Sequence, residues 1–189
     1  MITHMQLHSV DALIQRLNEG ELIAYPTEAV FGLGCDPDNE QAVLHLCALK
    51  QRPIEKGLIL VASHFELLTP YVDISLLTQQ QLEKIHASWP GPVTWVMPTK
   101  KDIPYYLKGQ FDTLAVRVSA HPIVRALSLA FNRPLVSTSA NVTSQPPAKT
   151  AEEVFIQFAD KVFISEGKIG DLDKPTLIKE ALTGKVLRY

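Results

Sequence analysis

Cysteine is scarce in this sequence, and long apolar runs and an excess of charge of one sign are absent. Two of its 189 residues are cysteine, Cys35 and Cys47, so a disulfide framework is excluded, and neither has the spacing of a zinc ligand. The longest nearly apolar stretch, residues 58–62, is far below the roughly 20 residues that cross a bilayer as a helix. Residues 1–8 lack the basic start and apolar run of a secretory signal. We therefore expect a soluble, cytoplasmic protein.

The balance of charge and hydropathy excludes two further classes of protein. The 18 Lys and Arg residues nearly balance the 20 Asp and Glu residues, so a global positive field cannot drive nucleic-acid binding, although a local basic patch can exist. With 46% hydrophobic and 20% charged residues, the chain is not mainly disordered, and its length is that of one domain. We expect a single domain over residues 1–189.

Familiar nucleotide-binding and hydrolase motifs are also absent. The P-loop pattern does not occur, and Gly32-Leu33-Gly34 lacks the third glycine of a dinucleotide fingerprint because Pro37 stands in its place. The patterns His-Glu-x-x-His and Gly-x-Ser-x-Gly do not occur either. The sequence therefore indicates neither a P-loop nor a Rossmann cofactor site. It also lacks the simplest evidence for a zincin or an α/β-hydrolase.

Apolar periodicity predicts strands and helices that alternate along most of the chain, which favours an α/β sheet covered by helices. Ser9 and Asp38 are predicted helix caps, Thr150 and Glu153 a capping box, and the segment after Pro26 a glycine-bearing loop. Helices are predicted over residues 10–17, 38–50, 65–68, 75–88 and 121–131 and from residue 150. Strands are predicted over residues 22–25, 57–62, 93–97, 113–118, 135–137 and 162–164, and in a closing hairpin of 176–178 with 185–187. The hairpin indicates mixed strand directions.

The segment 50–57 places three cations between a predicted helix and a predicted strand. Arginine offers a planar donor fork and lysine a compact charge, so Lys50, Arg52 and Lys56 together suit a polyphosphate. A solvated basic loop, partly neutralised by Glu55, is the alternative. Both interpretations remain open at this point.

Hydroxyl and amide groups gather at 137–141, where a predicted strand enters a loop. Alternate residues of a strand face the same side, so Ser137, Ser139 and, if extended geometry persists, Asn141 can line one wall of a site. Turn formation and backbone capping are the ordinary alternative for such residues. Arg117 lies on an apolar strand and needs an anionic partner, either a ligand carboxylate or a structural Asp or Glu. Thr27 follows a strand end, a common place for a site in α/β sheets but also for a simple turn.

Five segments that occur in a fixed order make the sequence resemble a known family. The segments are Tyr25-Pro26-Thr27-Glu28, Phe31-Gly32-Leu33-Gly34, Lys50-Gln51-Arg52-Pro53, Ala115-Val116-Arg117-Val118 and Ser137-Thr138-Ser139-Ala140-Asn141. In this order, over roughly residues 9–165, the chain resembles the YrdC-like family of threonylcarbamoyl-AMP synthases, and the length is similar to that of the short bacterial single-domain members. The resemblance includes the family's Lys-x-Arg and Ser-x-Asn signatures. It implies a twisted mixed sheet with surrounding helices and a concave, locally electropositive cavity.

The same resemblance implies a reaction, in which L-threonine, bicarbonate or CO2, and ATP with Mg²⁺ give L-threonylcarbamoyl-adenylate and pyrophosphate. The product would serve N6-threonylcarbamoyladenosine formation at position 37 of tRNA, which a separate transferase complex completes. No metal ligand from the protein and no tightly bound organic cofactor are expected. Lys50 and Arg52 are the expected catalytic residues. The expected ATP-binding residues are Lys50, Arg52, Lys56, Thr113, Ser139 and Asn141. The expected threonine-binding residues are Thr27, Arg117 and Ser137.

Four features depart from the family pattern. Ala29 stands where many relatives have a second threonine, and Val61 stands where some have a histidine. The Ser-Ala-Asn run continues as Val142-Thr143-Ser144 instead of Ser-Gly, and the match is loose beyond residue 165. We expect these changes to affect contacts more than the class of reaction.

Two other functions are consistent with a concave basic surface. One is a module that binds tRNA, double-stranded RNA or rRNA, whose affinity would fall steeply with salt and would not need threonine. The other is a small-molecule carbamoyl or acyl transferase that shares the anion site. Synthase activity, by contrast, would require ATP, threonine and bicarbonate together.

Overall fold

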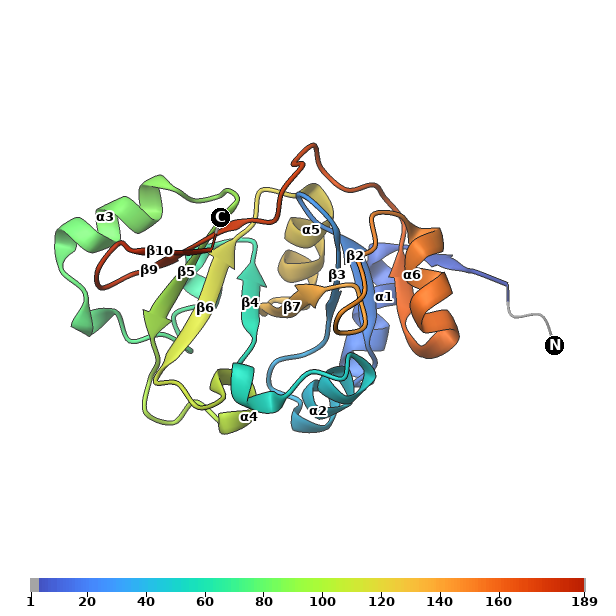
Figure 1. Ribbon diagram of the computed structural model, residues 1–189, viewed down its shortest axis with the longest axis horizontal. Coiled ribbons are helices and arrows are strands. Elements are labelled where there is room, and N and C mark those ends of the chain that lie inside the picture. The colour runs from blue at the N-terminus through green and yellow to red at the C-terminus, as the bar shows by residue number, and fades with distance from the viewer. Residues whose placement is uncertain (1–3, 189) are drawn as a thin grey trace.

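A ten-stranded mixed sheet with helices packed around it organises the protein (Figure 1). The computed structural model describes residues 4–188. The strands follow the order β1-β8-β2-β3-β7-β4-β6-β5-β9-β10, with parallel and antiparallel neighbours interspersed. The expected mixed α/β sheet is therefore confirmed, whereas the single domain over residues 1–189 stays a prediction. No helix among residues 4–188 is long and apolar enough to cross a membrane.

The strands and helices have the following bounds. The strands are β1 Leu7–His8, β2 Ile23–Pro26, β3 Phe31–Gly34, β4 Ile59–Ala62, β5 Val93–Pro98, β6 Thr113–Val118, β7 Leu135–Ser139, β8 Phe163–Ser165, β9 Leu177–Glu180 and β10 Val186–Arg188. The α-helices are α1 Val10–Asn18, α2 Glu40–Leu49, α3 Gln79–Ala87, α4 Tyr105–Lys108, α5 Pro122–Phe131 and α6 Ala151–Phe158. Short 3-10 turns lie at Ile54–Lys56, Phe65–Leu67, Ile74–Leu76 and Ala159–Lys161.

Alternation along the strands gives the sheet two buried faces. On β2, Ile23 and Tyr25 face a core that α1 and α5 cover, while Ala24, like Leu22 just before the strand, faces a larger core beneath α2 and α6. In the smaller core the amphipathic helices α1 and α5 pack against each other. Both faces of the central strands are therefore closed, except where the cavity described below opens.

Most predicted elements are present, and the differences have local causes. Ser9 caps α1 as predicted, by accepting a hydrogen bond from the backbone N of Ala12. The prediction that Asp38 caps α2 is wrong, because Asn39 does so and the Asp38 carboxylate accepts from the Tyr71 hydroxyl at 2.8 Å instead.

Three other predicted helix features form only in part. Thr150 caps α6, but the partner carboxylate of the predicted box, on Glu153, accepts from the Lys149 N–H. The predicted helix over 75–88 is divided, because Thr78 starts a new helix with a complete capping box to Gln81. The predicted helix over 65–68 is a single 3-10 turn.

The segment after Pro26, predicted as a loop, contains strand β3. The sequence pattern does not predict this strand because it contains two glycines, and glycine is depleted in strand interiors. Gly34 is required by close packing, since a Cβ there would lie 2.2 Å from the Val136 carbonyl oxygen and 2.9 Å from the Tyr25 ring. Strand β4 begins at Ile59 rather than at Gly57, because Gly57 has a φ of +63° that an extended strand does not use.

Replacing Gly34 with alanine tests this packing. We expect Gly34→Ala to lower the free energy of unfolding by about 2–3 kcal/mol, because strand β3 or β7 must move to admit the methyl group. Gly184→Ala is the matched control: Gly184 has a φ of +72° but no atom within 4 Å of an added Cβ, so only backbone strain of about 1 kcal/mol applies. Urea denaturation measures both, and equal losses would contradict the close approach at Gly34.

Candidate active site

A cavity of about 600 Å³ opens over one face of the sheet, and side chains from five paired strands form its floor. Ser137 of β7 pairs with Ile59 of β4, which pairs with Ala115 of β6. Ala115 in turn pairs with Val96 of β5, and Val96 with Glu180 of β9. All five residues line the cavity, because residues paired across strands project from the same face.

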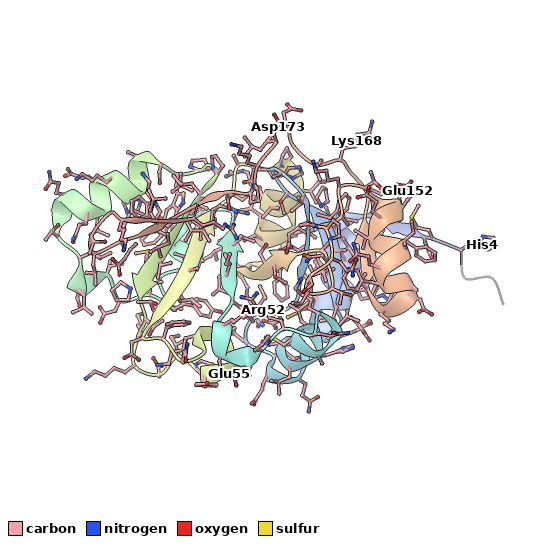
Figure 2. The ribbon with its side chains drawn as sticks, in the orientation of Figure 1. His4, Arg52, Glu55, Glu152, Lys168 and Asp173 are labelled. Carbon is pink, nitrogen blue, oxygen red and sulfur yellow. The ribbon has the colours of Figure 1, made fainter. Side chains whose placement is uncertain are left out.

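Cations from three distant parts of the chain meet at this cavity. Arg52 and Lys56 come from the loop between α2 and β4, Lys108 from the end of α4, and Arg188 from β10. Figure 2 shows Arg52 on the inner side of its loop and Glu55 at the outer edge of the molecule. The loop thus presents Arg52 and Lys56 to the cavity, which favours the anion-binding interpretation over a freely solvated basic loop.

Arg52 is held by its own loop. Its Nη2 donates to the Gly57 carbonyl at 2.8 Å, and its buried Nε has no hydrogen-bond partner among the described residues. Burial lowers the pKa of the Arg52 guanidinium, which still remains charged. A buried guanidinium N–H without a partner favours an anionic oxygen nearby.

Two glycines fix the cationic loop against the segment that carries Lys108. A Cβ on Gly57 would lie 2.8 Å from the Lys108 carbonyl oxygen, and one on Gly109 would lie 2.3 Å from the Glu55 carbonyl oxygen. Both glycines have positive φ, of +63° and +65°. Backbone hydrogen bonds from Leu58 to Leu107 and from Gln110 to Glu55 complete the contact. Lys108 is therefore held beside Arg52 and Lys56 as a rigid part of the same wall.

Arg117 lies in a buried polar network at the cavity, close to Arg188, because both arginines donate to Thr176. Its Nη2 is 3.3 Å from the Glu28 carboxylate, and its Nη1 donates to the Thr176 hydroxyl at 2.8 Å. The Ser119 hydroxyl donates to Glu28 at 2.7 Å. Glu28 is thus the structural carboxylate that was one of the two possible partners of Arg117. Arg117 also lines the cavity, and its buried Nε has no partner within residues 4–188.

The hydroxyl residues expected at the site lie along the cavity wall. Thr27, Thr113, Ser137 and Ser139 all line it. The Thr27 hydroxyl donates to the Val30 carbonyl at 2.7 Å, so its lone pairs remain available to accept from a ligand. Ala29, the residue that departs from the family pattern, also lines the cavity.

The structure brings most but not all of the expected site residues to the cavity surface. Seven of them line it, whereas Lys50 and Asn141 do not appear among the described lining residues. Strand β7 ends at Ser139, so the alternation that would have continued to Asn141 stops there. Val61 is fully buried in the core under α1 and α5 and does not line the cavity, so the histidine-to-valine change lies away from it. The seven are Thr27, Arg52, Lys56, Thr113, Arg117, Ser137 and Ser139.

Several lining residues were missed by the sequence analysis. Lys108 and Phe111 belong to a polar segment without a recognisable motif, and Thr176, Glu180 and Arg188 belong to the closing hairpin. The hairpin was predicted, but nothing in its sequence shows that parallel pairing with β5 turns one of its faces toward the cavity. Long-range pairing supplied these residues.

Comparison with known proteins identifies the family. A sequence profile named Sua5/YciO/YrdC, with the description "Telomere recombination", matches residues 15–189. The threonylcarbamoyl-AMP synthase of Vibrio campbellii is 51% identical over 183 residues, which cover 96% of this chain and 99% of the relative. That of Yersinia enterocolitica is 56% identical over 176 residues, which cover 93% of each. The chain belongs to the Sua5/YciO/YrdC family.

A solved structure shares this Sua5/YciO/YrdC fold. Sua5 of P. abyssi complexed with L-threonine superposes with a TM-score of 0.81 at 31% identity, over 90% of this chain and 50% of that one. The chain thus spans about half the length of that Sua5. The fold expected from the sequence is confirmed.

The pKa of Lys50 is strongly lowered in this protein. The residue is only 3% exposed, and burial, together with the neighbouring Arg52, lowers its pKa to about 8 from 10.5. The unfolded chain therefore holds more protons than the folded protein between these two values. The contribution of Lys50 to stability is least favourable below pH 8 and rises as the pH rises toward 10.5.

This titration predicts a pH-dependent stability difference. We expect the free energy of unfolding of the wild type to increase relative to that of Lys50→Met between pH 8 and pH 10.5. Urea denaturation of both proteins at several pH values measures the difference, from which the titration of all other groups cancels. A difference that stays constant over this interval would show that the Lys50 pKa is not lowered.

Proposed function

We propose that the cavity binds ATP and L-threonine side by side and that the chain joins them, with bicarbonate or CO2, into L-threonylcarbamoyl-adenylate and pyrophosphate. Identity of 51% and 56% to threonylcarbamoyl-AMP synthases over nearly the whole chain is the observation that carries this conclusion. The L-threonine complex of Sua5 from P. abyssi supports the amino-acid substrate. Arg52, Lys56 and Lys108 come from two joined segments of the cavity wall, whereas Arg117 and Arg188 both bond to Thr176, so the cavity offers two groups of cations for the two reactants.

The cations of the cavity suit the triphosphate. Among the described lining residues, five are Lys or Arg and one, Glu180, is a carboxylate. Arg52, Lys56 and Lys108 can share the negative charge of ATP, while Ser139 and Thr113 orient the nucleotide through hydroxyl groups. Asn141 acts through Ser139, whose hydroxyl donates to the Asn141 side-chain oxygen at 2.5 Å.

The Arg117 network suits the threonine carboxylate. A guanidinium has five N–H donors, and Glu28 and Thr176 engage two of its nitrogens. The partnerless Nε leaves a donor for a carboxylate in the cavity. Ser137 and Thr27 would recognise the remaining polar groups of the amino acid.

The reaction requires two anions to approach each other. The amine of threonine takes up CO2 to form a carbamate, and a carbamate oxygen then bonds to the α-phosphorus of ATP as the bond to pyrophosphate breaks. The cations reduce the repulsion between carbamate and phosphate and stabilise the charge that moves onto pyrophosphate. Holding both reactants in place can contribute on the order of 7 kcal/mol or more, so no covalent nucleophile is needed.

We propose that Mg²⁺ binds together with ATP. No group of three or more His, Cys, Asp or Glu side chains suited to hold a metal ion occurs in the described part of the chain. Mg²⁺ in nucleotide sites is bound largely by phosphate oxygens and water, with one or two carboxylates, and Glu180 is the carboxylate that the lining offers. The donor set therefore fits a metal that arrives with the nucleotide and adds charge neutralisation there.

We also propose that the product passes, in the cytoplasm, to a separate transferase complex for N6-threonylcarbamoyladenosine formation at position 37 of tRNA. The RNA-binding alternative is not favoured, because the similar curated proteins are named as synthases. Direct contact with tRNA stays a prediction.

A complete-mixture assay tests the proposed reaction. Purified protein with ATP, Mg²⁺, L-threonine and bicarbonate should release pyrophosphate and form an adenylate with the mass of threonylcarbamoyl-AMP. Omitting ATP, threonine or bicarbonate should abolish the adenylate. Folded protein that binds ATP but forms no adenylate in the complete mixture would overturn the proposed activity.

A conservative change tests the role of Arg117. Arg117→Lys keeps a positive charge beside Glu28, whereas alanine would leave that buried carboxylate without its cationic partner and destabilise the protein. We expect at least a tenfold rise in the KM for threonine and little change in the KM for ATP, because lysine lacks the fork that reaches both Glu28 and the ligand. An equal rise in both constants would assign Arg117 to the nucleotide.

A charge removal tests the role of Lys108. We expect Lys108→Ala to raise the KM for ATP about tenfold, since a charge-assisted hydrogen bond contributes roughly 1.5–3 kcal/mol. Lys101→Ala is the matched control, because Lys101 is exposed and is not among the described residues that line the cavity. Steady-state kinetics measures both, and identical constants for the two variants would place Lys108 outside the ATP site.

A further inference from the structure

Lys50 and the loop after β7 form one hydrogen-bonded unit behind the cavity wall. The Lys50 Nζ donates to the carbonyl of Ser139 at 2.5 Å and to that of Asn141 at 2.6 Å. In the opposite direction, the Lys50 carbonyl accepts from the Thr143 backbone N–H at 2.9 Å and from the Thr143 hydroxyl at 2.8 Å. One residue at the end of α2 thus makes four hydrogen bonds to residues 139–143.

The loop closes on itself around this contact. The Ser139 hydroxyl donates to the Asn141 side-chain oxygen, and the Asn141 amide donates to the carbonyls of Val142 and Gln145 at 3.1 and 2.9 Å. Ser139 is therefore tied to Lys50 through its own carbonyl and through Asn141, and of these three residues it alone is among the described lining residues. The two signatures, Lys50-x-Arg52 and Ser139-x-Asn141, each contribute one supporting and one cavity-facing residue.

We infer that Lys50 is a positioning residue that fastens the 139–143 loop to the end of α2 and so holds the Ser139 hydroxyl at the cavity wall. This role rests on the proposed function in assigning Ser139 to the nucleotide. It differs from the contact between Lys50 and the triphosphate that the family resemblance predicts. Two Nζ hydrogens are committed to neutral carbonyls, and Lys50 is buried and is not among the described lining residues.

The two roles predict different effects of removing the charge. If Lys50 touches the triphosphate, its removal weakens ATP binding but leaves AMP binding nearly unchanged, because most of the negative charge is on the β- and γ-phosphates. If Lys50 holds the loop, its removal weakens the binding of ATP and of AMP by the same factor, because Ser139 moves for both ligands. Only the second role loosens the backbone of residues 139–145 in the ligand-free protein.

The experiment compares Lys50→Met with Lys56→Met, a matched lysine of the same loop that lines the cavity. Hydrogen exchange of ligand-free protein should speed up at least tenfold at residues 139–145 in Lys50→Met and remain unchanged in Lys56→Met. Calorimetric titration should show equal fold-losses for ATP and AMP in Lys50→Met, and a larger loss for ATP than for AMP in Lys56→Met. Unchanged exchange at residues 139–145, with a loss confined to ATP, would overturn the inference.

A milder variant keeps the test valid if Lys50→Met does not fold. Thr143→Val removes the hydroxyl bond to the Lys50 carbonyl at an exposed residue and leaves all charges in place. Hydrogen exchange at residues 139–145 should again speed up, by a smaller factor. Unchanged exchange would count against the proposed fastening of the 139–143 loop by Lys50. Because hydrogen exchange needs no substrate, failure of this inference is distinguishable from failure of the synthase assay on the wild type.

Discussion

The register of the central strands is the constraint on which the cavity depends. Side chains that face one side of β7, β4, β6, β5 and β9 form a continuous row, and a shift of one residue in any strand would turn its member of the row to the other face. Close packing at Gly34 fixes how β3 lies against β7 at one edge of this row, because its backbone lies against the Val136 carbonyl of β7 and the Tyr25 ring.

Arg52 at the cavity and Lys50 behind its wall are held by neutral partners. Arg52 donates to a backbone carbonyl, and Lys50 donates to two more. Such partners satisfy hydrogen bonds without cancelling charge, so the positive charge of Arg52 stays available to an anionic substrate. Two other cations of the lining have carboxylate partners: Lys108 pairs with the exposed Asp112 at 3.1 Å, and Arg117 pairs with the buried Glu28 at 3.3 Å. The buried pair fixes the orientation of Arg117.

The contact between the cationic loop and the segment around Lys108 extends the site beyond its recognisable motifs. Gly57 and Gly109 allow two backbone segments to meet more closely than any side chain would permit. Lys108 and Phe111 reach the cavity through this contact, and Arg188 reaches it through the closing hairpin. The cavity is thus assembled from segments that span most of the chain.

The sequence by itself determined the alternation of strands and helices, the positions of most elements, and the residue types that form the anion-binding and hydroxyl-rich segments. Local periodicity and charge determine these features. Tertiary structure decided which residues reach the cavity: it placed Arg52 at the lining and Lys50 behind it, gave Arg117 the partner Glu28, and added Lys108 and Arg188. These outcomes depend on strand pairing and backbone contacts between residues far apart in the chain, for which no local pattern exists.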